Sequence, residues 1–141
     1  MFKIFKKDEL KSDEEDKILS KIGSLLIHAA KIDENYTSDE KNIIKKTLIE
    51  LGANNQKIDE IITNAEENEK NSNQILELTK EIKKTDKNFK IKVIEALWNI
   101  IYSDRKADIY ENSLMRRLTG LLYLSPKIVG DLKEKVKNDL K

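Results

Sequence analysis

A segment of this chain recurs 71 residues later, and this internal repeat limits the folds that the sequence can adopt. Residues 33–40 correspond to residues 104–111, and apolar positions on both sides keep the same offset. The matched pairs are Leu26 with Leu97, Asp33 with Asp104, Thr37 with Asp108, Glu40 with Glu111, Ile43 with Leu114, Ile44 with Met115, and Leu51 with Leu122. We therefore predict two similar helix-turn-helix halves related by a pseudo-twofold axis.

Apolar residues at helical spacing predict seven helices, over roughly residues 12–31, 37–51, 58–65, 75–82, 86–102, 108–122 and 125–136. Helix starts are indicated by Ser12, by Thr37-x-x-Glu40 and its copy Asp108-x-x-Glu111, and by Ser125 followed by proline. Gly52 can close the second helix. The third and fourth helices are more polar and should lie outside, whereas 86–102 should be central. No strand pattern is present, so the predicted fold class is all-α.

Composition restricts the class of protein further. The chain has 141 residues, 38% of them apolar, which suits a single domain. A formal charge of +1 gives no field that would attract nucleic acid, so partners must be recognised locally. The absence of cysteine excludes disulfides and sulfur-ligated metals. No apolar stretch approaches the roughly 20 residues of a transmembrane helix, and we expect a soluble, cytoplasmic protein.

The first eleven residues form a basic and apolar arm ahead of a helical domain over 12–141. The arm lacks the continuous apolar core of a secretory signal. Residues 1–7 could make a weak membrane-surface or partner contact, with Phe2, Ile4 and Phe5 inserting and the lysines facing anionic lipid. The alternative is a frayed terminus that folds back on the core.

Four carboxylates occupy matched positions in the two halves: Asp33, Glu40, Asp104 and Glu111. If the halves pack about the axis, their linkers meet and these residues form one acidic surface. The capping pattern by itself explains the two glutamates. The two aspartates follow helix C-termini, where the macrodipole disfavours an anion. A bound cation would explain their placement, and so would an Asx-turn in each linker.

A calcium EF-hand does not fit the first linker. Its sixth position is Ser38 instead of glycine and its twelfth is Ile44 instead of glutamate, while the second copy has Lys106 at the third position. The candidate cofactor is therefore a hard cation, Ca²⁺ or Mg²⁺, bound by carboxylates from both repeats.

Catalytic motifs are missing from the sequence. His28 is the only histidine and lies at the edge of an apolar face, and no glycine-rich phosphate loop occurs. Trp98 and Met115 belong to the core by spacing, and the Arg116-Arg117 pair fits either an acidic or phosphate partner or a solvated face. We predict a protein that is not an enzyme; a metal-dependent hydrolase using the four carboxylates is the remaining enzymatic alternative.

Several of these motifs resemble the TerB-like family, which includes the tellurite-resistance protein TerB and a domain of the DjlA co-chaperone. They are Ala29-Ala30-x-x-Asp33, Tyr36-Thr37-Ser38-Asp39-Glu40, Leu97-Trp98-x-x-x-Tyr102-x-Asp104, and Glu111-x-x-x-x-Arg116-Arg117-Leu118. The resemblance covers most of the chain, from residue 20 to residue 130. Where the family often has Ala-Asp-Gly, this chain has Glu34 and Arg105 after the aspartates.

The resemblance implies an all-helical fold of two halves with a small acidic surface that binds divalent metal. It also implies a role in bacterial stress responses through protein partners, including membrane-associated Ter components. Two functional hypotheses follow: a TerB-like adaptor with a cation at its acidic surface, and a purely structural protein-interaction module with no metal site.

Overall fold

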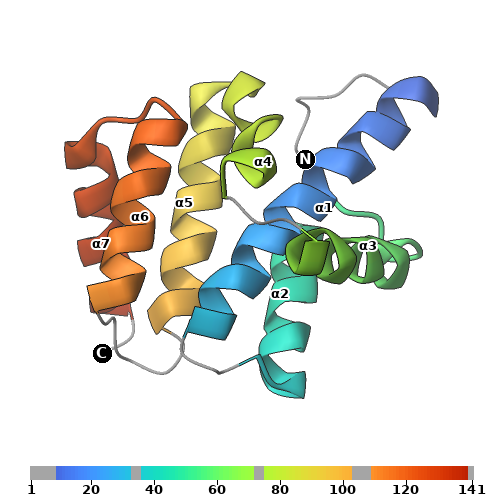
Figure 1. Ribbon diagram of the computed structural model, residues 1–141, viewed down its shortest axis with the longest axis horizontal. Helices are drawn as coiled ribbons and strands as arrows, with labels where there is room; N and C mark the ends of the chain where they lie inside the picture. The colour runs from blue at the N-terminus through green and yellow to red at the C-terminus, as the bar shows by residue number, and fades with distance from the viewer. Residues whose placement is uncertain (1–8, 33–35, 72–74, 103–108, 140–141) are drawn as a thin grey trace.

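The computed structural model describes residues 9–32, 36–71, 75–102 and 109–139 (Figure 1), and the side chains of these residues except 9–14, 75 and 109–111. This part of the chain folds into seven α-helices and one short 3-10 helix, and it contains no strand. The helices are α1 (Glu9–Ile32), α2 (Ser38–Glu50), α3 (Ile58–Asn71), α4 (Ile75–Thr79), the 3-10 helix η1 (Ile82–Lys84), α5 (Lys87–Ile101), α6 (Ile109–Leu121) and α7 (Pro126–Asp139). The all-α prediction and the number of helices are confirmed.

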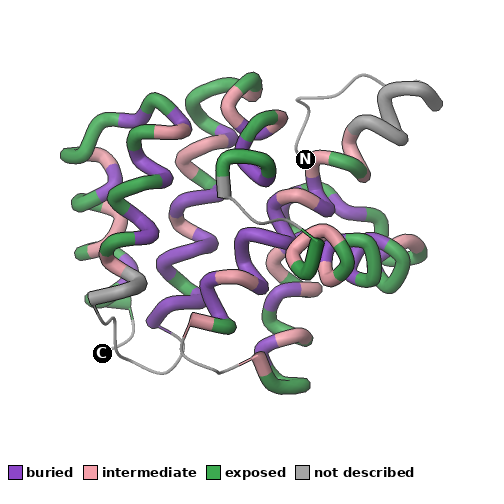
Figure 2. The backbone as a smooth tube through the Cα atoms, viewed as in Figure 1, coloured by how far each residue is buried: buried purple, intermediate pink, exposed green. Residues whose placement is uncertain are grey.

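Two helices form the centre of the molecule. α1 crosses it diagonally and packs against α2, α3, α4, α5 and α6, while α5 packs against α1, α2 and α7 (Figure 1). Buried residues follow both helices along most of their length (Figure 2). The predicted central position of residues 86–102 is confirmed, and α1 shares it because its own apolar face is equally buried.

Side-chain caps begin three of the helices. The Glu40 amide donates to Thr37 Oγ1 at 3.3 Å, as the capping pattern predicts, and the Phe89 amide donates to Asp86 Oδ1 at 2.8 Å. Ser125 Oγ accepts from the Lys127 amide at 3.2 Å, with proline in the first turn of α7. The cap predicted at Ser12 is wrong, because α1 already begins at Glu9.

The fourth predicted helix is interrupted. α4 ends at Thr79, whose hydroxyl donates to the Leu76 carbonyl at 3.1 Å, and Ile82 belongs to the separate 3-10 helix. Leu78, Thr79 and Ile82 are buried, although the segment was expected on the outside. α4 and η1 therefore bury one face of the connection between the two repeated units.

The same C-terminal motif closes the second helix of each unit. After α2, the Gly52 amide donates to Ile49 O and the Ala53 amide to Leu48 O; after α6, the amides 71 residues later donate to Gly120 O and Thr119 O. Both are Schellman motifs, with Gly52 at φ 124° and Tyr123 at φ 57°. The closing role predicted for Gly52 is confirmed, and the register of the repeat holds at this turn.

The repeat extends to a third helix in each unit. Adding 71 to the buried positions Ile58 and Ala65 of α3 gives Val129 and Val136, which are buried in α7. α3 packs along α1, and α7 packs along α5. The repeated unit is thus three helices, α1–α3 and α5–α7, joined by α4 and η1. The pseudo-twofold relation between the units stays a prediction.

Candidate functional site

The segments that flank the two predicted linkers lie at one edge of the molecule. α1 and α5 end there, and α2 and α6 begin there, along the lower side of Figure 1. A pocket of about 440 Å³ separates the last turns of α1, at His28 and Ile32, from Ser113, Leu114 and Arg117 of α6. The helix that leads into the first linker therefore lies beside the helix that follows the second, as expected if both linkers share a surface.

Of the four predicted ligands, the structure describes the side chain of Glu40 alone. Asp33 and Asp104 lie outside the described residues; Glu111 belongs to α6, but its side chain is also outside them. The structure thus leaves the meeting of the four carboxylates as a prediction.

Glu40 occupies the first turn of α2 and is only 9% exposed. Its amide is capped by Thr37, and its negative charge lies at the positive end of the helix dipole, where an anion is favoured. A carboxylate is also an oxygen ligand of the type that Ca²⁺ and Mg²⁺ prefer. Glu40 is therefore suited to both roles that the sequence leaves open, that of a cap residue and that of a cation ligand.

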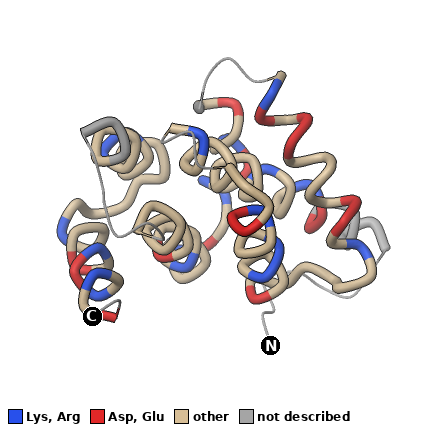
Figure 3. The backbone as a smooth tube through the Cα atoms, turned by 90° about the horizontal axis from the view of Figure 1, so that it is seen from below, with Lys and Arg blue, Asp and Glu red and all other residues tan. Residues whose placement is uncertain are grey.

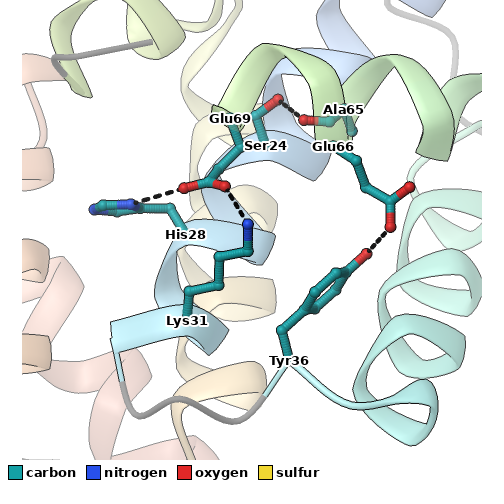
Figure 4. Close-up of polar contacts among 7 residues, drawn as sticks. All are labelled: Ser24, His28, Lys31, Tyr36, Ala65, Glu66 and Glu69. Carbon is teal, nitrogen blue, oxygen red and sulfur yellow. Dashed lines mark hydrogen bonds and ion pairs between the residues drawn. The ribbon is translucent and has the colours of Figure 1, made fainter. Parts of the chain in front are cut away.

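A hydrogen bond anchors the chain where it leaves the first linker. Tyr36 Oη donates to Glu66 Oε2 at 2.7 Å (Figure 4). Lys41 Nζ lies 3.1 Å from the same oxygen. Burial and the contact with Glu66 raise the pKa of the Tyr36 hydroxyl. Burial opposes ionisation of Glu66, but the hydrogen bonds from Tyr36 and Lys41 outweigh it and lower the pKa of that carboxyl. The charged carboxylate thus fixes the start of α2 against α3.

A second polar contact holds the last turns of α1 against α3. Lys31 Nζ lies 2.7 Å from Glu69 Oε1, and His28 Nδ1 lies 3.6 Å from Glu69 Oε2 (Figure 4). The His28 side chain is 41% exposed, which confirms its boundary position. Lys31 Nζ also lies 5.9 Å from the centroid of the Tyr36 ring. Together with Glu66, Glu69 fixes both ends of the first linker to α3.

Sequence reasoning missed Glu66 and Glu69. They occur in a polar run with no cap or ligand spacing, and only their separation of three residues indicates that they share a helix face. Nothing in the run connects that face with α1. Their role arises from the packing of α3 along α1.

The described residues supply no complete metal site. No group of three or more His, Cys, Asp or Glu side chains is close enough to hold an ion in this part of the structure. Viewed from the linker edge, acidic and basic residues are interspersed along the described helices (Figure 3). An acidic surface at this edge would therefore depend on Asp33, Asp104 and Glu111.

Comparison with known proteins identifies a family. The family model described as tellurite resistance protein TerB matches residues 19–134, which is most of the chain. No curated protein and no solved structure matches. Over the residues that the structure describes, no helix has both the length and the apolar character needed to cross a membrane.

Proposed function

We propose that this chain, which belongs to the TerB family, is a non-enzymatic adaptor in a bacterial, tellurite-resistance-type stress response. The family match and the all-α fold support the assignment. We place the protein in the cytoplasm, with protein partners that include membrane-associated Ter-type components. Residues 1–7 would add a weak contact with the membrane surface.

A divalent cation at the linker edge is the second part of the proposal. Asp33, Glu40, Asp104 and Glu111 would bind Ca²⁺ or Mg²⁺ as oxygen ligands. The observation that carries this proposal is the position of the helix ends: α1 and α5 end, and α2 and α6 begin, at one edge. A cation bound there by both units would fix the two linkers relative to each other and shape the surface that a partner recognises.

The alternative is a structural interaction module without metal. The bond from the Glu40 amide to Thr37 is one half of a capping box. Such a box also calls for Glu or Gln at this position, so a capping role would account for Glu40 without any ligand. The two proposals differ in whether the linker edge responds to a cation.

Titration of isotope-labelled protein with CaCl₂ or MgCl₂, followed by NMR, separates the two proposals. The first predicts saturable shifts confined to the linkers and to the first turns of α2 and α6. Replacing Asp33 and Asp104 with Asn should abolish these shifts and leave the far-UV circular dichroism unchanged. Asp59→Asn is the matched control, since Asp59 is an exposed carboxylate on α3 that pairs with Lys45 at 2.9 Å.

Two outcomes would contradict the cation site. Absence of any shift at millimolar metal favours the interaction module. Shifts that persist in the Asp33→Asn, Asp104→Asn double variant and disappear in Asp59→Asn would assign the cation to another surface.

A further inference from the structure

A groove lies between the three helices of the second unit, outside the four predicted ligands. Its volume is about 940 Å³, and residues of α5, α6 and α7 line it, among them Trp98, Met115, Arg116, Val129 and Lys133. Pockets that hold small organic molecules occupy about 300–1,000 Å³ and combine apolar walls with a few polar groups. The groove has this size and composition.

Two helical glycines keep the groove open. Gly120 of α6 and Gly130 of α7 both line it, and a Cβ atom added at either position would meet no atom within 4 Å. Glycine destabilises a helix interior relative to alanine. Neither glycine is required by close packing or by a positive φ. The open space beside each one exists because glycine has no side chain.

At three positions of the groove, the first unit has apolar side chains instead. Subtracting 71 from three residues of the groove gives positions that belong to the core or pack against it. The pairs are Leu48 with Thr119, Ile49 with Gly120, and Ile62 with Lys133. Leu48 and Ile62 are at most 1% exposed. At these three positions the second unit thus has smaller or charged residues in place of apolar ones.

The charged groups of the groove are cations. Lys133 Nζ donates to Asn112 Oδ1 at 3.2 Å and lies 5.5 Å from the centroid of the Trp98 ring, which keeps it over the groove. Arg116 is exposed on the facing helix. Among the described residues that line the groove, none is acidic. The groove thus combines apolar side chains with two cationic ones, and no carboxylate is among its described lining residues.

We infer that this groove binds a small organic anion with an apolar body, of the acyl or aryl carboxylate class. The apolar body would contact Trp98, Met115 and Val129 and so be removed from water. The carboxylate would pair with the Arg116 guanidinium, which can donate two parallel hydrogen bonds, and with the Lys133 ammonium. The residues that carry this inference are not among the four proposed cation ligands, so it does not rest on the cation site.

Octanoate is a suitable probe, and the protein supplies its own reporter. Trp98 is the only tryptophan in the chain, so its fluorescence reports from the wall of the groove. Octanoate should give a saturable change in Trp98 fluorescence. Acetate, which lacks the apolar body, and octylammonium, which carries the opposite charge, should each bind at least about tenfold more weakly.

Two variants test the groove from its apolar and its charged side. Gly120→Ile introduces the side chain of the first unit, and it should abolish octanoate binding while the helical circular dichroism and melting temperature are maintained or raised. Arg116→Gln should weaken octanoate binding about tenfold, since it removes a charge-assisted pair. Lys46→Gln is the control, because it removes a positive charge from an exposed position on α2.

The inference is overturned if octanoate causes no saturable change, if octylammonium binds as well as octanoate, or if folded Gly120→Ile keeps the wild-type affinity. None of these results bears on the cation site, whose response is measured by metal titration of the linkers. Conversely, if the protein does not bind Ca²⁺ or Mg²⁺, it should still bind octanoate.

Discussion

At the residue scale, Gly52 and Tyr123 occupy the same position of the two repeated units with different side chains. Both follow a helix with positive φ, 124° and 57°. Glycine adopts this region freely, whereas for another L-residue the left-handed conformation costs roughly 1–2 kcal/mol. The Tyr123 side chain is 76% exposed, and its ring centroid lies 5.9 Å from Lys90 Nζ. A contact this exposed offsets only part of the backbone strain.

Replacing Tyr123 with glycine should therefore stabilise the protein. We expect the free energy of unfolding to rise by about 1 kcal/mol, because relief of the strained φ exceeds the entropy that glycine adds to the unfolded chain. Urea denaturation measures the change. Tyr123→Ala is the control, since it removes the ring and retains Cβ, so it should give no gain. Equal stabilisation by both variants would mean that the ring, and not the backbone, is unfavourable.

At the element scale, the packing of α3 on α1 depends on small residues of α1. A Cβ atom at Gly23 would lie 2.9 Å from Ala65 Cβ and 3.2 Å from Leu48 Cδ1. The neighbouring Ser24 hydroxyl donates to the Ala65 carbonyl at 2.8 Å and is fully buried. Such close approach requires glycine at this position, and the serine satisfies a backbone acceptor inside the interface.

Replacing glycine with alanine should therefore have opposite effects on stability at Gly23 of α1 and at Gly130 of α7. Gly23→Ala should lower the free energy of unfolding by about 1–3 kcal/mol, because the overpacked contact outweighs the better helix propensity of alanine. Gly130→Ala should raise it by up to about 1 kcal/mol, because its Cβ enters open space. Thermal denaturation of the two variants gives the comparison. A gain in stability for both would show that α1 and α3 can separate at no cost.

The elements also show how far the sequence predicts this structure. The cap at Thr37, the Ser125-Pro126 start and the Gly52 turn depend on local residues, and all three are confirmed. The start of α1 at Glu9 was missed, because the charged residues around it have no apolar period. Both α3 and α7 were predicted as helices, but their equivalence in the repeat was missed, since they share scattered buried positions and no motif.

The candidate sites also differ in how far the sequence predicts them. The common edge of the helix ends that flank the two linkers is consistent with the repeat, because equivalent helices end there. The anchoring of that edge by Glu66 and Glu69 depends on how two helices pack, and no local pattern encodes it. The groove of the second unit is harder still to predict, because it results from side chains that are missing at Gly120 and Gly130.

At the scale of the whole molecule, the two units share one hydrophobic core. α1 packs against the other helices of its own unit and also against α4, α5 and α6. Leu26 of α1 and its equivalent Leu97 of α5 are both fully buried within that core. A unit separated from the other would expose the apolar surface between α1 and α5, so we expect the units to unfold together.

Leu26→Ala tests this coupling with a reporter in the opposite unit. The substitution should lower the free energy of unfolding by about 2–5 kcal/mol, as removal of a buried leucine side chain does. Trp98 lies in the second unit, so its fluorescence should shift to the same lower denaturant midpoint as the far-UV circular dichroism. Leu76→Ala, at a position 48% exposed, should leave both midpoints nearly unchanged. A Trp98 transition that stayed at the wild-type midpoint would mean that each unit folds alone. A transition at the common lower midpoint would mean that the core shared by α1 and α5 fixes the two units relative to each other.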